Sequence, residues 1–429
     1  MRPIEKEVRH LSLLGSPERR LIILVGSISF VTSIVYSIVG ALAPMFSKDL
    51  AIPSQDIGTI AGVYSLAGAF SGFLGSLFLD RFDRRKGLAI SITGVVIGVL
   101  LTAVAPNREF LIAARILSGM FSGPSSAFSI AIIIDNVPVE RRGTALGSIT
   151  SFQALGQILG LPAGLVLANM LDSWRFPFFA IAAVGALLAA WVILNLAPQR
   201  AHLEGRKKFA INDRLRLMGE LLTRRNCLVA WGIQLTGIVP LVAITTIMSV
   251  FLVNNLGYPN SQLPTLYIIG GASNLVFSWV IGRAIDRFGA TIVSVASSIL
   301  LTAAIVFGYM GVNLGIPLLV IFPVFFFTSS ARLVVGQTIT MRIPRQDERA
   351  GFQSLGQSIQ SFAMAASAMA IPYLLGSTPD GKLTGINPFA TGVIVVTWIF
   401  PVLVAKLSQM LDRARPAATA PIVGQQAAE

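Results

Sequence analysis

The chain has 429 residues, a formal net charge of +13, 54% hydrophobic residues and only 12% charged residues. Soluble domains carry about 25% charged residues, so this chain has too little charge to coat soluble domains and is too apolar to be disordered. These values predict a polytopic membrane protein. The single cysteine and the two histidines, which lie outside the apolar runs, exclude an internal disulfide, a cysteine metal site and histidine proton chemistry inside the membrane.

Twelve apolar runs of about 20 residues, the length that a helix needs to cross the hydrocarbon layer, follow one another along the chain. They are uniformly apolar rather than alternating, so they predict helices and not the strands of a membrane barrel. The first run is too long for the apolar core of a signal peptide and eleven more follow it, so we expect it to be retained. The predicted spans are 21–44, 57–79, 87–105, 109–135, 143–168, 175–197, 227–254, 263–285, 290–310, 316–341, 350–375 and 388–410.

The lysines and arginines predict the orientation of these spans. If the N-terminus is cytoplasmic, 27 of the 33 basic residues fall in cytoplasmic segments or at the span ends beside them and 4 fall on the outer side, and the other two, Arg115 and Arg332, lie well inside spans. This asymmetry places both termini in the cytoplasm, as expected for an integral protein of a bacterial inner membrane. A basic balance can also indicate nucleic-acid binding, but topology signals beside anionic lipid explain it better, so we expect no nucleic-acid partner.

The long polar stretch 198–226 divides the spans into two sets of six that resemble each other. Three landmarks recur at an offset of 206 or 207 residues, which indicates a duplication. They are Asp80-Arg81-Phe82 with Asp286-Arg287-Phe288, Glu140-Arg141-Arg142-Gly143 with Asp347-Glu348-Arg349-Ala350, and Gln153 with Gln360. The predicted organisation is a cytoplasmic tail 1–20, a six-helix bundle 21–197, a cytoplasmic linker loop 198–226, a second six-helix bundle 227–410 and a disordered cytoplasmic tail 411–429. In transporters built from repeats, the substrate site lies near the midplane between the halves.

Several motifs along the chain resemble those of the major facilitator superfamily. The loop signature Gly-x-x-x-Asp-Arg-x-Gly-Arg-Arg is matched by Gly282 through Gly289 without the final basic pair, and by Ser76 through Arg85 with Ser76 and Asp83 in the glycine slots. Span 4 carries Arg115-x-x-x-Gly119, and span 5 carries a motif similar to that of drug–proton antiporters, Gly156-x-x-x-Gly160-x-Pro162-x-Gly164. The loop 80–85 and the segments around Arg332 and 349–354 look typical of the bacterial arabinose efflux permease group.

This resemblance implies two six-helix bundles that rock about a central site, and it implies roles for charged residues at the inner helix ends. The acid of each loop would face a helix N-terminus of the other half, and the loop arginine would pair with the acid that ends span 4, closing the cytoplasmic side. The alternative is that these residues are only topology signals and end caps. The predicted gating residues are Asp80, Arg81, Arg84, Asp135, Asp286 and Arg287.

Arg115 and Arg332 are the only basic residues that lie away from the ends of the predicted spans. A buried arginine costs roughly 2.5–3.5 kcal/mol at a helix centre on insertion scales, so such a residue faces the bundle or an aqueous cavity. For Arg332 we favour the cavity over a structural hydrogen bond to carbonyl groups, and for Arg115 both interpretations stay open. Their surroundings look alike, but their offset of 217 does not fit the repeat, so we treat them as different positions.

Acidic residues are missing from the middle of every span. Proton-coupled exporters usually contain a membrane-embedded carboxylate, so the resemblance implies proton antiport while the residues supply no obvious proton carrier. Asp135, Asp80 and Asp56 are the remaining candidates. A cavity with net positive charge would favour neutral or anionic solutes.

Polar amides and hydroxyls within spans predict the faces of a substrate cavity, with hydrogen bonding between helices as the alternative. Gln353, Gln357 and Gln360 share one helix face by their spacing. The other candidates are Gln153, Gln157, Gln234, Thr236, Asn274 and Tyr36. Gly156, Gly160 and Gly164 form a small-residue stripe beside Pro162, which predicts close helix packing, with a role in bending or in limiting leak as the alternative.

These observations predict a secondary transporter that works by rocker-switch alternating access, as an exporter coupled to protons. The alternatives are an uncoupled facilitator or an importer of a neutral or anionic solute, and, from another class, a transporter-like membrane sensor. Motifs of hydrolases and nucleotide-driven pumps are missing from the sequence, so we expect no enzyme, cofactor or metal. A monomer is expected, because one chain contains both halves of the pathway.

Overall fold

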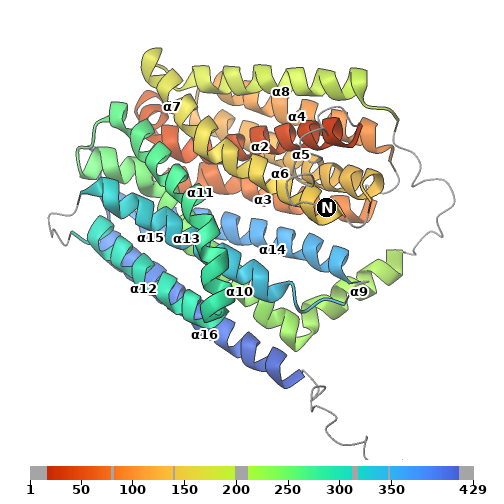
Figure 1. Ribbon diagram of the computed structural model, residues 1–429. Helices are drawn as coiled ribbons and strands as arrows, with labels where there is room; N and C mark the ends of the chain where they lie inside the picture. Colours follow the sequence, from red (N-terminus) through yellow and green to blue (C-terminus); the bar gives the residue numbers. More distant parts are fainter. Residues whose placement is uncertain are drawn as a thin grey trace, which may run out of the picture.

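The computed structural model describes residues 17–78, 82–138, 141–198, 211–311, 317–345 and 348–414. Its long helices form two groups that lie side by side (Figure 1). The first group contains α2 (Pro17–Asp49), α3 (Ile57–Phe78), α4 (Arg84–Ala103), α5 (Arg108–Asn136), α6 (Arg142–Leu155) with its continuation α7 (Leu161–Met170), and α8 (Arg175–Asn195). The second contains α10 (Arg225–Val250), α11 (Leu263–Phe288), α12 (Ala290–Tyr309), α13 (Leu318–Thr340), α14 (Arg349–Met369) and α16 (Ile386–Ala414).

Ten helical segments among the described residues are long and apolar enough to cross a membrane, and they coincide with ten of the predicted spans. The spans predicted at 263–285 and 350–375 are helical as well. They form α11, which packs on α13 and α7, and α14, which packs on α3 and α10. The architecture is therefore the predicted all-α membrane fold with a six-helix bundle in each half.

The structure differs from the sequence-based expectation in the linker, in span 5 and at the end of span 11. The linker contains a helix, α9 (Ile211–Thr223), where a loop is expected. Span 5 is interrupted by a π-helical turn, Gly156–Gly160, because Pro162 has no N–H to continue the regular pattern. Span 11 ends at Met369 and is followed by α15 (Ile371–Leu374) and by a hairpin of β1 (Gly376–Ser377) and β2 (Leu383–Thr384).

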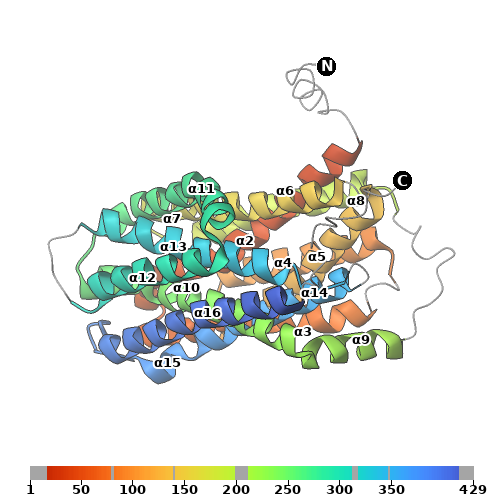
Figure 2. The same cartoon turned by 60° about the horizontal axis from the view of Figure 1, so that its bottom comes forward.

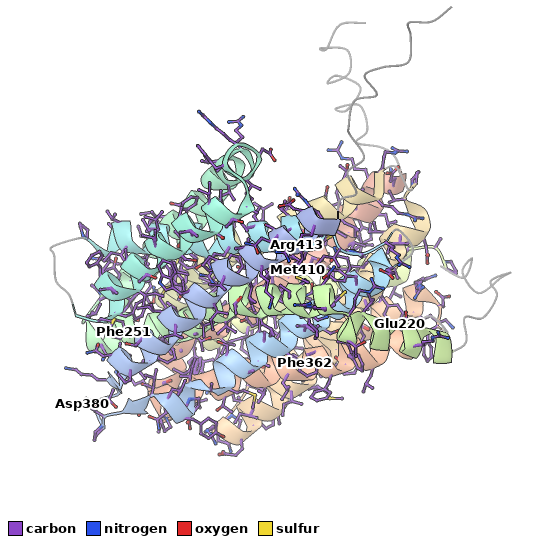
Figure 3. The ribbon with its side chains drawn as sticks, turned by 90° about the horizontal axis from the view of Figure 1, so that it is seen from below. Glu220, Phe251, Phe362, Asp380, Met410 and Arg413 are labelled. Carbon is purple, nitrogen blue, oxygen red and sulfur yellow. The ribbon has the colours of Figure 1, made fainter. Side chains whose placement is uncertain are left out.

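The bundle has two ends with different elements. Figure 2 shows α9 and the start of α2 at one end, which we name the terminal face, and α15 at the other end, which we name the distal face. Seen from below, Glu220 lies near the terminal face, Phe251 and Asp380 lie near the distal face, and Phe362 lies between them (Figure 3). In the predicted orientation the terminal face is cytoplasmic.

The duplication is visible in the entry to the second helix of each half. Pro53 precedes a 3-10 turn, Ser54–Asp56, that leads into α3. Pro259 precedes a 3-10 turn, Asn260–Gln262, that leads into α11, and both prolines have extended backbone angles. Pro53 and Pro259 are separated by 206 residues, the offset of the sequence repeat. The two halves thus repeat a local structure that their sequences show only in part.

The glycine stripe of span 5 packs against α2. A Cβ atom on Gly160 or Gly164 would overlap the tip of Ile34 or Ile38, which are side chains that can move. A Cβ atom on Gly156 would overlap Ser33 Oγ and lie 2.6 Å from the backbone carbonyl oxygen of Phe30, which cannot move without shifting α2. The stripe therefore lets the two helices approach closely, and Gly156 is its strictest position.

We expect Gly156→Ala to destabilise the protein more than Gly160→Ala, by about 1–3 kcal/mol, because its Cβ atom meets backbone rather than a side-chain tip. Thermal unfolding of the purified protein in detergent measures the difference. Gly147→Ala is the matched control, since a Cβ atom at Gly147 has open space around it. Equal unfolding temperatures for the Gly156 and Gly147 variants would contradict this packing.

Candidate functional site

Arg115 of α5 is fully buried beside α2 and α3. Its Nη1 donates a hydrogen bond of 2.9 Å to the carbonyl oxygen of Val35 on α2. The guanidinium lies 4.4 Å from the ring centroid of Tyr64 on α3. Nε and Nη2 have no hydrogen-bond partner among the described residues. A cationic group thus keeps two buried donors without a hydrogen-bond partner among the described residues.

Tyr36 connects this arginine to the seam between the halves. Its ring lies 6.3 Å from that of Tyr64, measured between centroids. Tyr36 is one turn before Gly40 on α2 and so shares its face. A Cβ atom on Gly40 would lie 3.4 Å from the carbonyl oxygen of Thr245 on α10, so this face of α2 points toward the second half. Arg115, Tyr64 and Tyr36 therefore form a polar and aromatic series that runs from the first bundle toward the seam.

Arg332 of α13 has a different environment. It is fully buried within the second bundle. Its Nη1 donates to the Thr397 carbonyl oxygen at 3.1 Å and to Ser298 Oγ at 3.3 Å, and Nη2 donates to the Thr236 carbonyl oxygen at 2.8 Å. The guanidinium also lies 4.5 Å from the ring centroid of Phe400. Nε has no hydrogen-bond partner among the described residues. The contacts of the two Nη atoms tie α10, α12 and α16 to α13, which supports the structural alternative rather than the cavity position that the sequence favours.

The candidate amides lie on both sides of the seam. Gln153 and Gln157 are exposed on α6 and the π-helical turn, and Gln353 and Gln357 are exposed on α14, while Gln360 is half-buried there. The structure thus keeps the shared face that the α14 spacing predicts. Gln353 Nε2 lies 2.7 Å from Met341 Sδ as a hydrogen-bond donor.

The remaining cavity candidates differ in what the structure shows. Gln234 lies against Gly356 of α14. The hydroxyl of Thr236 donates to Gly232 within its own helix at 2.7 Å, so this residue acts through its backbone carbonyl on Arg332. The side chain of Asn274 lies outside the described residues. Gln337, which is exposed on α13, is an additional amide that the sequence analysis did not select, although an amide within a span is the same signal that selected the others.

The gating residues are placed only in part. Asp80 and Arg81 lie outside the described residues. Arg84 Nε lies 3.4 Å from Asp135 Oδ2, which is the contact that the resemblance implies, and its role in gating stays a prediction. Asp286 and Arg287 are exposed at the end of α11.

The two copies of the loop signature have different backbone geometry. Asp83, which replaces a glycine of the signature, has φ −57 and caps α4 by accepting a hydrogen bond from the Arg85 N–H at 3.0 Å. Gly289 occupies the same slot in the second copy and has φ +83, a conformation that favours glycine. The aspartate therefore fits the first copy because its backbone does not need a positive φ.

Two ion pairs at the terminal face were not selected from the sequence, and they occupy duplicated positions. Arg141 Nη1 lies 3.2 Å from Glu18 Oε2 in the first half. In the second half Arg224 makes two contacts with Glu348, at 2.6 and 2.9 Å. Glu18 and Arg224 are 206 residues apart and Arg141 and Glu348 are 207 apart, so the second pair repeats the first with the charges exchanged. Each pair joins the first helix of its half to the start of the fifth.

The second pair also anchors α9. Trp231 Nε1 donates to the Leu221 carbonyl oxygen at 3.1 Å, and Leu221 is fully buried against Trp231 and Phe352. The Arg224 guanidinium holds the pKa of Glu348 at about 2, below its ordinary value of 4.5, and the Arg345 N–H that donates to the same carboxylate lowers it further. The linker helix is therefore fixed to the second half.

The carboxylates of the described residues lie at helix ends and in loops. Asp56, a candidate proton carrier, pairs with Arg108 at 3.1 Å. Asp49 accepts from Trp174 Nε1 at 2.9 Å and from Arg175 Nη2 at 3.2 Å. Within the described part of the chain, no cluster of three or more histidine, cysteine, aspartate or glutamate side chains could hold a metal ion. The site thus offers a guanidinium, tyrosines and amides rather than a buried acid.

An apolar groove of about 540 Å³ lies where span 5 of the first half meets α11 of the second. It is lined by α7, the π-helical turn and Ile268 of α11. Its lining side chains are apolar, and Met170 is one of them. This groove offers no polar group to a solute, which leaves Arg115 and the amides as the candidate binding groups.

We expect Arg332→Lys to lower the thermal unfolding temperature by about 5 °C or more, because one ammonium cannot reach acceptors on three helices. The profile of transported solutes should stay unchanged, since this side chain lies inside one bundle. Unfolding in detergent and a competition assay with several solutes measure the two effects. A changed profile of transported solutes with unchanged stability would contradict the structural role and would support a position of Arg332 in the substrate cavity.

We expect Glu348→Gln to lower the unfolding temperature at pH 7. Because the pKa of Glu348 is lower in the folded chain than in the unfolded chain, its stabilisation is complete above about pH 4.5 and is lost as the pH falls toward 2. The difference between wild type and variant should therefore shrink below about pH 4.5. Glu220→Gln is the control, because its pair with Arg216 is exposed. A difference that is constant over this pH range would contradict the assignment.

Comparisons with known proteins were made against families, sequences and structures. The profile of the Major Facilitator Superfamily matches residues 25–368. An uncharacterized MFS-type transporter of Bacillus subtilis, YbcL, is 25% identical over 80% of this chain and 85% of its own length. A chloramphenicol resistance protein of Streptomyces lividans is 23% identical over 82% of this chain and 88% of its own length.

Other relatives match over a smaller part. A triacylglyceride transporter of Mycolicibacterium hassiacum is 26% identical over 42% of this chain, and the match covers only 33% of that protein. Among solved structures, an inward-facing bacterial homologue of the lysosomal transporter Spinster has a TM-score of 0.72 and 15% identity, and covers 94% of this chain and all of its own. The nucleoside transporter NupG has a TM-score of 0.68 and 15% identity, and covers 91% of this chain and 99% of its own.

Proposed function

We propose that this chain exports a neutral or anionic organic solute by rocker-switch alternating access. The chain belongs to the Major Facilitator Superfamily and is thus a secondary transporter of small solutes, which is the premise of the proposal. In this proposal both termini are cytoplasmic, the chain acts as a monomer in a bacterial inner membrane, and the site lies between the two bundles.

The environment of Arg115 carries the proposal for the solute. A guanidinium with two unpartnered donors attracts carboxylate or phosphate groups and repels cations. Tyr64 and Tyr36 extend this polar surface toward the seam and add aromatic faces. The exposed amides of α6 and α14 add neutral donors and acceptors on either side. Because the described spans supply no buried carboxylate, a cationic solute would find no counter-charge.

Export is supported by the glycine motif of span 5 and by similarity to a chloramphenicol resistance protein over most of the chain. Proton antiport is the coupling that the resemblance implies. An uncoupled facilitator or an importer is the alternative that the helix-end carboxylates favour. A membrane sensor is the alternative from another class, and it would bind solute without moving it.

A flux assay in proteoliposomes tests the site. We expect Arg115→Met to reduce transport of anionic solutes about 10- to 100-fold, because a hydrogen bond to a charged group contributes about 1.5–3 kcal/mol. Transport of neutral solutes should change about twofold or less. Arg216→Met is the control, because Arg216 is exposed on α9 and pairs only with Glu220 among the described residues. Equal losses for both solute classes would contradict anion recognition by Arg115.

The same vesicles with an imposed pH gradient distinguish the forms of transport. Accumulation that collapses with the gradient supports proton antiport and directs attention to Asp135, Asp80 and Asp56. Transport that only equilibrates the solute supports a facilitator. Binding without flux of any solute would support the sensor.

A further inference from the structure

Ser54 and Gly381 join the two halves at the distal face. Ser54 Oγ, at the start of the 3-10 turn before α3, donates a hydrogen bond of 2.8 Å to the carbonyl oxygen of Gly381. Asn254, in the π-helical turn Phe251–Asn255 that follows α10, donates from Nδ2 to the same carbonyl oxygen at 2.9 Å. Ser54 belongs to the first half and is buried, whereas the other two residues belong to the second half. One carbonyl oxygen thus receives donors from both halves.

The β1–β2 hairpin presents this carbonyl in a fixed position. Asn255 donates to the Leu383 carbonyl oxygen at 2.8 Å and accepts from the Leu383 N–H at 2.9 Å, which holds the hairpin to the turn after α10. Gly381 has φ +77, and a Cβ atom there would lie 3.1 Å from Asn254 Nδ2. A glycine is therefore required in this turn. The hairpin is fixed to its own half, and among the described residues its hydrogen bond to the other half comes from Ser54.

A second junction lies at the position related by the duplication. Asn169, at the end of α7, donates from Nδ2 to the carbonyl oxygen of Asn260 at 3.2 Å. Asn260 is 206 residues after Ser54 and, like it, opens a 3-10 turn that follows a proline. Each 3-10 turn thus contacts the other half near its fifth span, at the end of that span in one case and in the hairpin that follows it in the other. The Asn169 junction is exposed and has one hydrogen bond of 3.2 Å between the halves. At the Ser54 junction the serine is buried, its hydrogen bond to Gly381 is shorter at 2.8 Å, and Asn254 Nδ2 lies within hydrogen-bond distance of Ser54 Oγ at 3.5 Å.

We propose that these two junctions form an unequal pair of latches that hold the distal face closed, and that the Ser54–Gly381–Asn254 latch is the stronger of the two. Alternating access, on which this proposal rests, requires the distal ends of the bundles to separate once in each cycle. The backbone of each bundle stays intact during such a movement, so the hydrogen bonds between the halves are the ones that break. The strength of the Ser54 latch then sets how often the distal face opens.

A buried reporter measures this opening without any transport. Ala61 of α3 is buried against Ala363 and Ala368 of α14, in contact between the halves. In the full-length chain with Cys227→Ala and Ala61→Cys, a membrane-impermeant maleimide labels position 61 only when the halves separate there. We expect Ser54→Ala to raise the labelling rate two- to tenfold, the effect of losing one neutral hydrogen bond. Asn254→Ala should act in the same direction, and Asn169→Ala should have a smaller effect.

Ser91→Ala is the matched control, because Ser91 is also buried but its hydroxyl bonds only to Gly87 within α4 among the described residues. Thermal unfolding of each variant confirms that it is folded, and Asn254→Ala provides the test if Ser54→Ala does not fold. Labelling rates of the Ser54 and Asn254 variants equal to that of the Ser91 variant would overturn the proposal, as would a larger effect of Asn169→Ala. Faster labelling without flux of any solute would support the latch and reject the proposed transport.

Discussion

The close approach of α2 to the glycine stripe of α6 and α7 is the contact on which the site depends. Gly156 lets α2 lie directly against span 5, where any side chain would push it away. The position of α2 then decides where the Val35 carbonyl meets Arg115 and where Tyr36 lies at the seam. The same helix meets α10 of the other half, so a packing contact inside one bundle also sets the geometry between the bundles. In lipid, such contacts rely on packing, because the hydrophobic effect does not draw helices together.

The two buried arginines show how differently one membrane bundle can accommodate the same costly group. Arg332 has acceptors from three helices for its Nη atoms, and it stabilises the second bundle as an internal tie. Arg115 has one carbonyl acceptor and an aromatic ring, and its Nε and Nη2 have no hydrogen-bond partner among the described residues. A guanidinium with spare donors is better suited to a ligand that arrives and leaves. Among the described residues Arg332 lacks a hydrogen-bond partner only at Nε, whereas Arg115 lacks one at Nε and at Nη2. The two arginines are therefore distinguished by how many of their donors are bonded, since both are fully buried.

Much of the fold could be predicted because its signals are strong and local. Twelve apolar runs, the basic loops and the repeated Asp-Arg-Phe landmarks fix the helices and the two bundles. The site could be predicted only as a set of candidates. Whether Arg332 faces a cavity depends on the backbone carbonyl groups of Thr236 and Thr397. These residues are far from Arg332 in the sequence, and nothing in the sequence around them indicates that they accept its hydrogen bonds. Short-range periodicity likewise gives no signal for a π-helical turn, for a two-residue hairpin or for the pairing of Arg224 with a residue 124 positions away.

The exchanged charges of the two terminal-face ion pairs have a consequence for how the duplicated halves could diverge. In the first half the acid is on the first helix and the base precedes the fifth, and in the second half this order is reversed. Copying the segment around Glu348 over that around Arg141 would set two carboxylates against each other, and the reverse copying would set two guanidiniums together. Recombination between the repeats is thus penalised electrostatically at this point. The two halves can keep the same architecture while each retains its own sequence, which is the condition for their arginines and latches to become specialised.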